Sequence, residues 1–152
     1  MMALFEDRME AFFADFGKSR KMVLSTSEND RVSSRMMSVV QINGEFYFQT
    51  DKKLKKYRQL QVNHHVALCI ENIQIEGLCE EIGHPLDNPT FCSVFKECFK
   101  GSYDAYSSLK NERLFLVRPF YIERWIYKNG IPHIESFCIE NKQYGFEKYS
   151  GE

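Results

Sequence analysis

Long hydrophobic runs are missing from this chain of 152 residues, and so is a positively charged leader. No apolar stretch approaches the roughly 20 residues that a membrane-spanning helix needs. The opening residues, MMALFEDRMEAFF, carry acidic side chains early and lack the basic-then-apolar order of a secretory signal. We therefore expect a soluble protein of the cytoplasm that does not bind membranes.

Paired cysteines and zinc-ligand spacings are also missing. The five cysteines are an odd number, include no CxxC pair and show no spacing to histidine that is typical of a zinc site. Cys69 and Cys138 lie inside apolar runs, where a reduced cysteine behaves as a small hydrophobic residue. The pattern favours a reducing compartment and predicts no metal site.

Neither sign of charge is in excess, since 20 basic and 21 acidic residues give a formal net charge of −1. Nucleic-acid-binding domains usually carry a basic excess, so we expect no nucleic-acid partner. Repeats, linkers and low-complexity tracts are absent as well. The length is enough for one sizeable core, and we expect residues 1–152 to form a single domain.

The elements that are present are mostly short strands. Apolar residues recur at helical spacing over about residues 2–17, where a glycine ends the pattern. We expect further helices at 52–62, 89–99 and 103–109, and strands at 21–27, 32–42, 45–50, 65–71, 74–82, 113–118, 121–127 and 134–139.

Two details refine this pattern. Gly77 inside a strand indicates a β-bulge or a close approach of another backbone, and Pro119 is expected to separate two strands. The tail after about residue 140 is polar and is expected to fray. Antiparallel hairpins without regular βαβ alternation predict a mainly β fold, a small barrel with flanking helices.

The clearest functional signal follows a predicted hairpin. Asn43-Gly44 lies between two apolar runs, and both residues of such a tight turn need positive φ. The returning strand ends at Thr50-Asp51, and Asp51 is the expected N-cap of the next helix. Free backbone N–H groups, a hydroxyl and cations at one helix start are suited to a phosphate. The cations are Lys52, Lys53, Lys55 and Lys56.

The order of these features resembles a known family. It runs from Arg35-Met36-Met37 through the Asn-Gly hairpin, an aromatic strand ending in Thr50 and a lysine-rich helix to Asn-His-His-Val-Ala-Leu. This order resembles the FMN-binding split-barrel proteins related to pyridoxamine 5′-phosphate oxidase, and in particular their small bacterial general-stress-protein-like branch. The resemblance extends over about residues 21–139. It implies a six-stranded antiparallel split β-barrel, mainly β with flanking α.

The resemblance also implies a homodimer that binds FMN at its subunit interface. Arginine offers the flavin phosphate a planar fork that lysine lacks, and charge-assisted bonds are about twice as strong as neutral ones. The family pattern places the phosphate at Arg35, Thr50, Lys55 and Lys56. It places the flavin ring or its surroundings at Met36, Met37, Ser38, Gln49, Asn72 and Trp125, with Asn72 contributed by the other subunit.

The implied reaction is two-electron transfer between flavin and a small organic substrate, with NAD(P)H as a candidate reductant. The flavin carries the redox chemistry, and no catalytic side chain can be named from the sequence. The C-terminal stretch IYKNGIPHIESFCIENKQYGFEKY lacks the Arg-x-His arrangement expected for pyridoxal phosphate. This departure argues against a true pyridoxamine 5′-phosphate oxidase.

Several alternatives stay open at this point. The chain could be a non-enzymatic flavin-binding, flavin-storage or redox-sensing protein, or it could bind haem or a deazaflavin on the same fold. It could also be a cofactor-free module whose lysines bind an acidic partner. A lysine run is often only a solvated helix face, paired methionines are often core, and Trp125 suits core packing as well as flavin stacking.

Overall fold

The computed structural model describes residues 2–151, and these form four α-helices, one short 3₁₀ helix and eight strands. The helices are α1 (Met2–Phe16), α2 (Lys55–Val62), η1 (Pro85–Asp87), α3 (Pro89–Cys98) and α4 (Lys100–Tyr106). The strands are β1 (Ser19–Glu28), β2 (Arg31–Ile42), β3 (Glu45–Asp51), β4 (His65–Ile70), β5 (Ile73–Glu81), β6 (Glu112–Lys128), β7 (Ile131–Cys138) and β8 (Gln143–Lys148).

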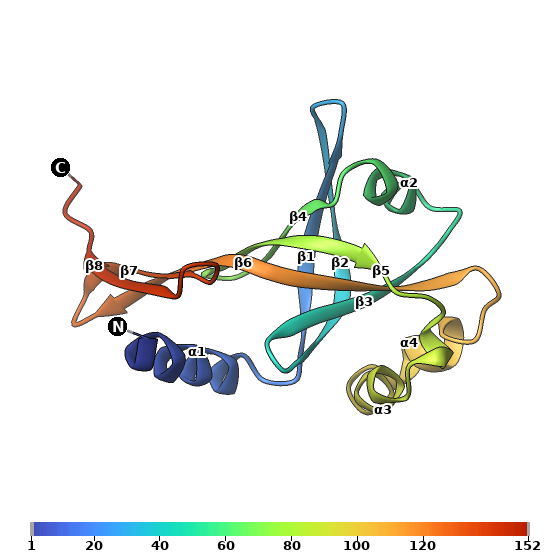
Figure 1. The fold of residues 1–152 in the computed structure, drawn as a ribbon, viewed down its shortest axis with the longest axis horizontal. Helices are drawn as coiled ribbons and strands as arrows, with labels where there is room; N and C mark the ends of the chain where they lie inside the picture. Colours follow the sequence, from blue (N-terminus) through green and yellow to red (C-terminus); the bar gives the residue numbers. More distant parts are fainter. Residues whose placement is uncertain (1, 152) are drawn as a thin grey trace.

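Six strands close into an antiparallel barrel, which confirms the predicted split-barrel fold. Their order is β3-β2-β1-β4-β5-β6, and β3 closes the ring by pairing with β6 from Phe46↔Val117 to Asp51↔Glu112. β6 is 17 residues long, so its second half extends past the barrel and pairs with β7. β7 and β8 therefore continue the sheet on the left of Figure 1.

Alternation along the strands fills the barrel interior with apolar side chains. Leu24, Val39, Phe48 and Leu68 come from different strands and belong to one fully buried cluster. Burying each such side chain contributes roughly 1.5–3 kcal/mol. α1 packs on the side where β7 and β8 leave the barrel (Figure 1), and α2 closes one end of the barrel.

The structure corrects the expectation that Pro119 ends a strand. β6 continues through Pro119, because a β-bulge against β5 absorbs the irregularity. Glu76 pairs with Tyr121 while its neighbour Gly77 pairs with Pro119, so the ladder skips a residue at the proline. A bulge is one of the few places where a strand accommodates a residue without an N–H group. The bulge predicted at Gly77 is confirmed.

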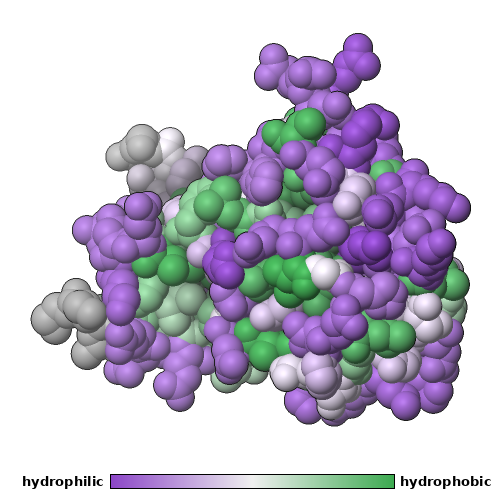
Figure 2. All heavy atoms as spheres, turned by 45° about the vertical axis from the view of Figure 1, so that its right-hand side comes forward, coloured by the Kyte–Doolittle hydropathy of each residue, from purple (hydrophilic) through white to green (hydrophobic). Residues whose placement is uncertain are grey.

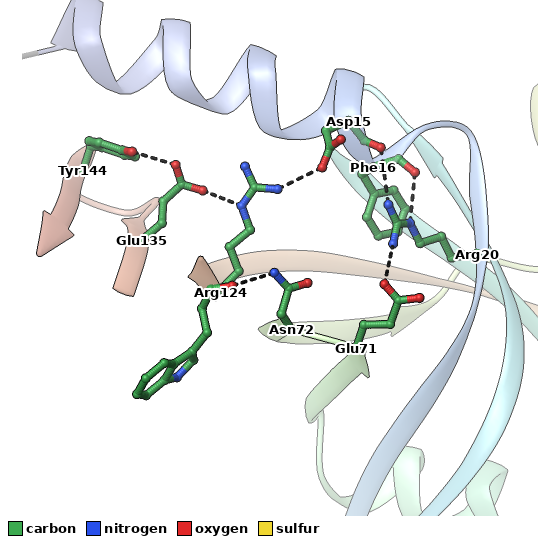
Figure 3. Close-up of polar contacts among 9 residues, drawn as sticks. Asp15, Phe16, Arg20, Glu71, Asn72, Arg124, Glu135 and Tyr144 are labelled. Atoms are coloured by element: carbon green, nitrogen blue, oxygen red, sulfur yellow. Dashed lines mark hydrogen bonds and ion pairs between the residues drawn. The ribbon is translucent and has the colours of Figure 1, made fainter. Parts of the chain in front are cut away.

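The polar tail was also predicted wrongly, because it forms an ordered edge strand. β8 pairs with β7 from His133↔Lys148 to Cys138↔Gln143. The Tyr144 hydroxyl donates to Glu135 Oε2 at 2.6 Å, as Figure 3 shows. Backbone pairing and this one inward contact stabilise a segment that has little hydrophobic pattern of its own.

Polar residues cover most of the face in Figure 2, and hydrophobic residues show between them as separate patches. No helix within residues 2–151 has both the length and the apolar character needed to cross a membrane. Over the same range the five cysteines are unpaired, and no group of three or more metal-ligating side chains occurs.

Candidate functional site

Arg35 lies at the end of the barrel that α2 covers. Its Nη1 donates to the carbonyl of Leu24 at 3.1 Å and to Thr26 Oγ1 at 2.9 Å. Its Nη2 donates to Gln59 Oε1 at 3.4 Å, and the same oxygen accepts from the Thr26 hydroxyl. Gln59 belongs to α2 and is only 1% exposed. The guanidinium is therefore fixed between β1, β2 and α2.

Lys56 is the second cation at this end of the barrel. Among the ion pairs of residues 2–151, none joins Lys56 or Arg35 to a carboxylate. Burial lowers the pKa of Lys56, and the positive charge of Arg35 lowers it further, with only partial compensation by Glu112. Burial also lowers the pKa of Arg35. Two partly buried cations without a counter-ion make a site that an anion would stabilise.

Thr50 adds a hydroxyl that lacks a partner. It is 3% exposed, and its Oγ1 is the only buried side-chain polar atom in the described part of the chain without a hydrogen bond. Alternation places Thr50 on the same side of β3 as Phe48, which points into the barrel core. Leaving a buried hydroxyl unpaired costs about 1–3 kcal/mol, so this atom fits a role as a ligand contact.

The start of α2 differs from the prediction. The helix begins at Lys55 and not at Lys52, and Asp51 is not its N-cap. Asp51 Oδ1 instead accepts from the Lys53 N–H at 2.7 Å, which makes a tight turn between β3 and the helix. Leu54 precedes the helix and offers no side-chain cap, so the first helical N–H groups are left for water or a ligand.

Three of the predicted ring contacts lie on β2 and β3, on the face opposite to the one that carries Arg35 and Thr50. Met36, Ser38 and Gln49 line a small pocket of about 150 Å³. The Ser107 hydroxyl donates to Gln49 Oε1 at 2.8 Å, and Gln49 Nε2 donates to Glu112 Oε2 at 2.9 Å. Met37 also borders this pocket but packs against the barrel core, since β-strand alternation turns it away from Met36.

Asn72 and Trp125 lie together, but at the other end of the β4–β5 hairpin. Asn72 Nδ2 donates to the Trp125 carbonyl at 2.6 Å, and the Trp125 N–H donates to the Asn72 carbonyl at 3.2 Å. The six residues of β4 separate this turn from α2, a distance of about 20 Å at 3.3 Å per residue. One chain thus brings Arg35 and Lys56 within electrostatic reach of each other but leaves Asn72 and Trp125 apart from them.

A larger concavity lies elsewhere, between α1 and the turn that joins β2 to β3. Its volume is about 880 Å³, and none of the predicted site residues lines it. Three of its polar lining residues are carboxylates, namely Glu6, Glu10 and Glu45. These acids would repel a phosphate, so we place the candidate site at the α2 end of the barrel.

Thr50→Val tests whether the unpaired hydroxyl is kept for a ligand. Valine has almost the same shape, so the ligand-free protein is expected to gain up to about 1–2 kcal/mol in free energy of unfolding when the unpaired atom is removed. Thr26→Val is the matched control, because it breaks bonds to Arg35 and Gln59 and is expected to destabilise. Urea denaturation measures both. A loss of stability in Thr50→Val equal to that in Thr26→Val would contradict this assignment.

Sequence reasoning missed three residues of the site. Thr26, Gln59 and Glu112 are buried polar residues that face Arg35, Lys56 or Gln49. The only local signal was a polar side chain where the pattern calls for an apolar one, as at Glu112 just before the run RLFLV. Their mutual contacts depend on how the barrel closes.

No protein-family model and no curated protein matches the sequence. Solved structures do match in fold. General stress protein 26 from Bacillus anthracis str. Sterne is 22% identical, with a TM-score of 0.58 over 80% of this chain and 92% of that one. A pyridoxamine 5′-phosphate oxidase-related, FMN-binding protein from Nostoc punctiforme PCC 73102 is 14% identical, with a TM-score of 0.62 over 97% and 94%.

The haem storage protein from Vibrio cholerae is similar to the same degree. It is 20% identical, with a TM-score of 0.57 over 76% of this chain and 89% of that one. These similarities confirm the resemblance at the level of the fold. The chain has the split-barrel fold of the pyridoxamine 5′-phosphate oxidase-related, FMN-binding proteins.

Proposed function

We propose that this protein is an FMN-binding flavoprotein. The observation that carries the proposal is the pair of partly buried cations Arg35 and Lys56, which have no carboxylate partner among the described ion pairs. The unpaired hydroxyl of Thr50, at the end of β3 that leads to α2, supports it. A phosphate monoester supplies the negative charge that Arg35 and Lys56 lack and an acceptor oxygen for the Thr50 hydroxyl. Similar solved structures include an FMN-binding protein, which supports the choice of flavin.

In this proposal Arg35, Thr50, Lys55 and Lys56 hold the phosphate. Lys55 is exposed and reaches the site from the first turn of α2. Met36, Ser38 and Gln49 contact the ring, and Met37 supports that strand from the core side. Bound FMN would supply two-electron transfer chemistry. The protein's own contribution is to orient the ring and to limit access of water to it.

A homodimer completes the site. Met36 and Tyr106 are each 54% exposed and border the same small pocket. None of the described residues covers this apolar edge of the ring site. Large exposed apolar side chains of this kind are typical of interfaces. In this proposal Asn72 and Trp125 contact the flavin from the second subunit, since β4 separates them from the phosphate end of the site in their own chain.

The proposed activity is that of a cytoplasmic oxidoreductase that transfers electrons between FMN and a small organic substrate, with NAD(P)H as the reductant. True pyridoxamine 5′-phosphate oxidase activity is not part of the proposal. His133, the one histidine near the C-terminal segment, bonds to the Ile131 carbonyl and stacks on Phe146.

The visible absorption spectrum of the freshly purified protein tests the proposal. We expect flavin bands that persist after added FMN and gel filtration. A haem or deazaflavin spectrum would assign the fold to another cofactor, and a colourless protein that does not retain FMN would overturn the proposal. Anaerobic NAD(P)H oxidation, followed with a panel of acceptors, then separates an enzyme from a flavin-storage or redox-sensing protein.

A further inference from the structure

Glu112 lies between the two halves of the candidate site. It is the first residue of β6, is 5% exposed and pairs in register with Asp51 at the end of β3. Its Oε2 accepts from Gln49 on the ring side, while Lys56 lies within electrostatic reach on the phosphate side. No part of the proposed function so far uses this carboxyl group.

The carboxyl group fixes how Gln49 presents its amide. Gln49 Oε1 accepts from the Ser107 hydroxyl, and one hydrogen of Nε2 points at Glu112. A primary amide has two N–H donors, so one donor of Gln49 remains for the pocket that Met36 and Ser38 also line. The ionised carboxylate favours this orientation, because a flipped amide would turn its oxygen toward the negative charge of Glu112.

The surroundings of Glu112 disfavour the ionised form of its carboxyl group. Burial raises the pKa of Glu112, and the negative charge of Asp51 raises it further. The hydrogen bond from Gln49 and the positive charges of Lys56 and His84 act in the opposite direction without cancelling this rise. A dianionic phosphate beside Lys56 would add negative charge close to Glu112 and would disfavour its ionised form again.

We propose that Glu112 is a positioning residue whose carboxyl group takes up a proton when the flavin phosphate binds. The inference rests on the proposed function, because it assumes that the phosphate lies beside Lys56. In the bound state the neutral acid still accepts from Gln49 through its carbonyl oxygen, so the ring contact is retained while the negative charge disappears. FMN affinity is therefore coupled to pH through this one side chain.

The sign of the coupling follows from the charge of each form. Below its pKa Glu112 is neutral and does not oppose the phosphate, whereas above its pKa the carboxylate repels it. Wild-type affinity for FMN should thus fall as pH rises through the raised pKa of Glu112. Glu112→Gln keeps an acceptor for Gln49 but is neutral at every pH, so it should lack this fall.

The experiment measures the dissociation constant for FMN by fluorescence quenching between about pH 5 and about pH 8. The ratio of the wild-type to the Glu112→Gln dissociation constant is expected to rise with pH, by about threefold to tenfold across the range. Taking a ratio removes the titration of the phosphate itself, which both proteins share. Glu97→Gln, an exposed carboxylate of α3 that pairs with Lys18, is the control and should follow wild type.

Two further measurements make the outcome decisive. His84→Asn removes the imidazole near Glu112 and should keep the wild-type fall in affinity, so a flat profile in that variant would overturn the assignment to Glu112. Calorimetry at about pH 7, in buffers of different ionisation enthalpy, should show more proton uptake on FMN binding in wild type than in Glu112→Gln, because the titration of the phosphate and of Lys56 is common to both proteins. Equal proton uptake in the two proteins would overturn the proposal.

A constant ratio of wild-type to Glu112→Gln affinity across the pH range would also overturn it while leaving FMN binding intact. Failure of wild type to bind FMN at any pH is a different result. It would remove the proposed function and with it the premise of the inference.

Discussion

The double variant Arg35→Ala/Lys56→Ala is expected to bind FMN at least about a hundredfold more weakly than wild type. Each side chain is a cation with no carboxylate partner among the described ion pairs, so each is available to a phosphate. Hydrogen bonds to charged groups contribute about 1.5–3 kcal/mol each, and a hundredfold loss corresponds to about 2.7 kcal/mol. Equilibrium dialysis or fluorescence quenching with FMN measures the loss.

Lys52→Ala/Lys53→Ala is the matched control for this result. It removes the same number of positive charges, but both lysines are exposed and lie just before α2. We expect less than about a threefold change, because screened surface charges contribute little. An equal loss in the two double variants would mean that the lysine run attracts anions only in a general way and that Arg35 and Lys56 form no defined site.

Gly77→Ala is expected to destabilise the protein by about 2 kcal/mol or more, the largest effect that we expect from so small a change. A methyl group at this position would lie 2.7 Å from Val117 Cγ1 and 2.8 Å from the Arg118 carbonyl oxygen. Val117 is fully buried and the carbonyl belongs to the backbone of β6, so neither atom can move without disturbing the barrel. Chemical denaturation followed by far-UV circular dichroism measures the change.

Gly101→Ala provides the comparison. Gly101 lies in α4, and nothing within 4 Å would contact an added methyl group. Alanine is favoured over glycine in a helix by roughly 0.5–1 kcal/mol, so this variant should be neutral or slightly more stable. If Gly77→Ala were as stable as Gly101→Ala, the result would contradict the close packing of β5 on β6 at the bulge.

Local signals predicted the first half of the fold well. The Asn43-Gly44 turn is present with φ of 53° and 81°, as a two-residue hairpin requires. The turn at Asn29-Asp30 likewise has both residues at positive φ. These features depend on residues adjacent in sequence, so their side chains alone indicate the backbone shape.

Features that depend on distant pairing were not predictable in the same way. Pro119 lies within β6 only because Gly77 on another strand permits the bulge, and β8 is a strand only because β7 offers an edge. The same holds in the site. The sequence pattern and the family resemblance selected Arg35, Thr50 and Lys56, but the buried partners Gln59 and Glu112 meet them only after the barrel closes.

The most direct test of the phosphate site compares FMN with riboflavin as ligands of the wild-type protein. The two share the ring and the ribityl chain and differ only in the phosphate. Contacts from Arg35, Lys56 and Thr50 predict that FMN binds at least about a hundredfold more tightly, with the difference lost in Arg35→Ala/Lys56→Ala. Equal affinity for FMN and riboflavin in the wild-type protein would contradict a phosphate site at the start of α2.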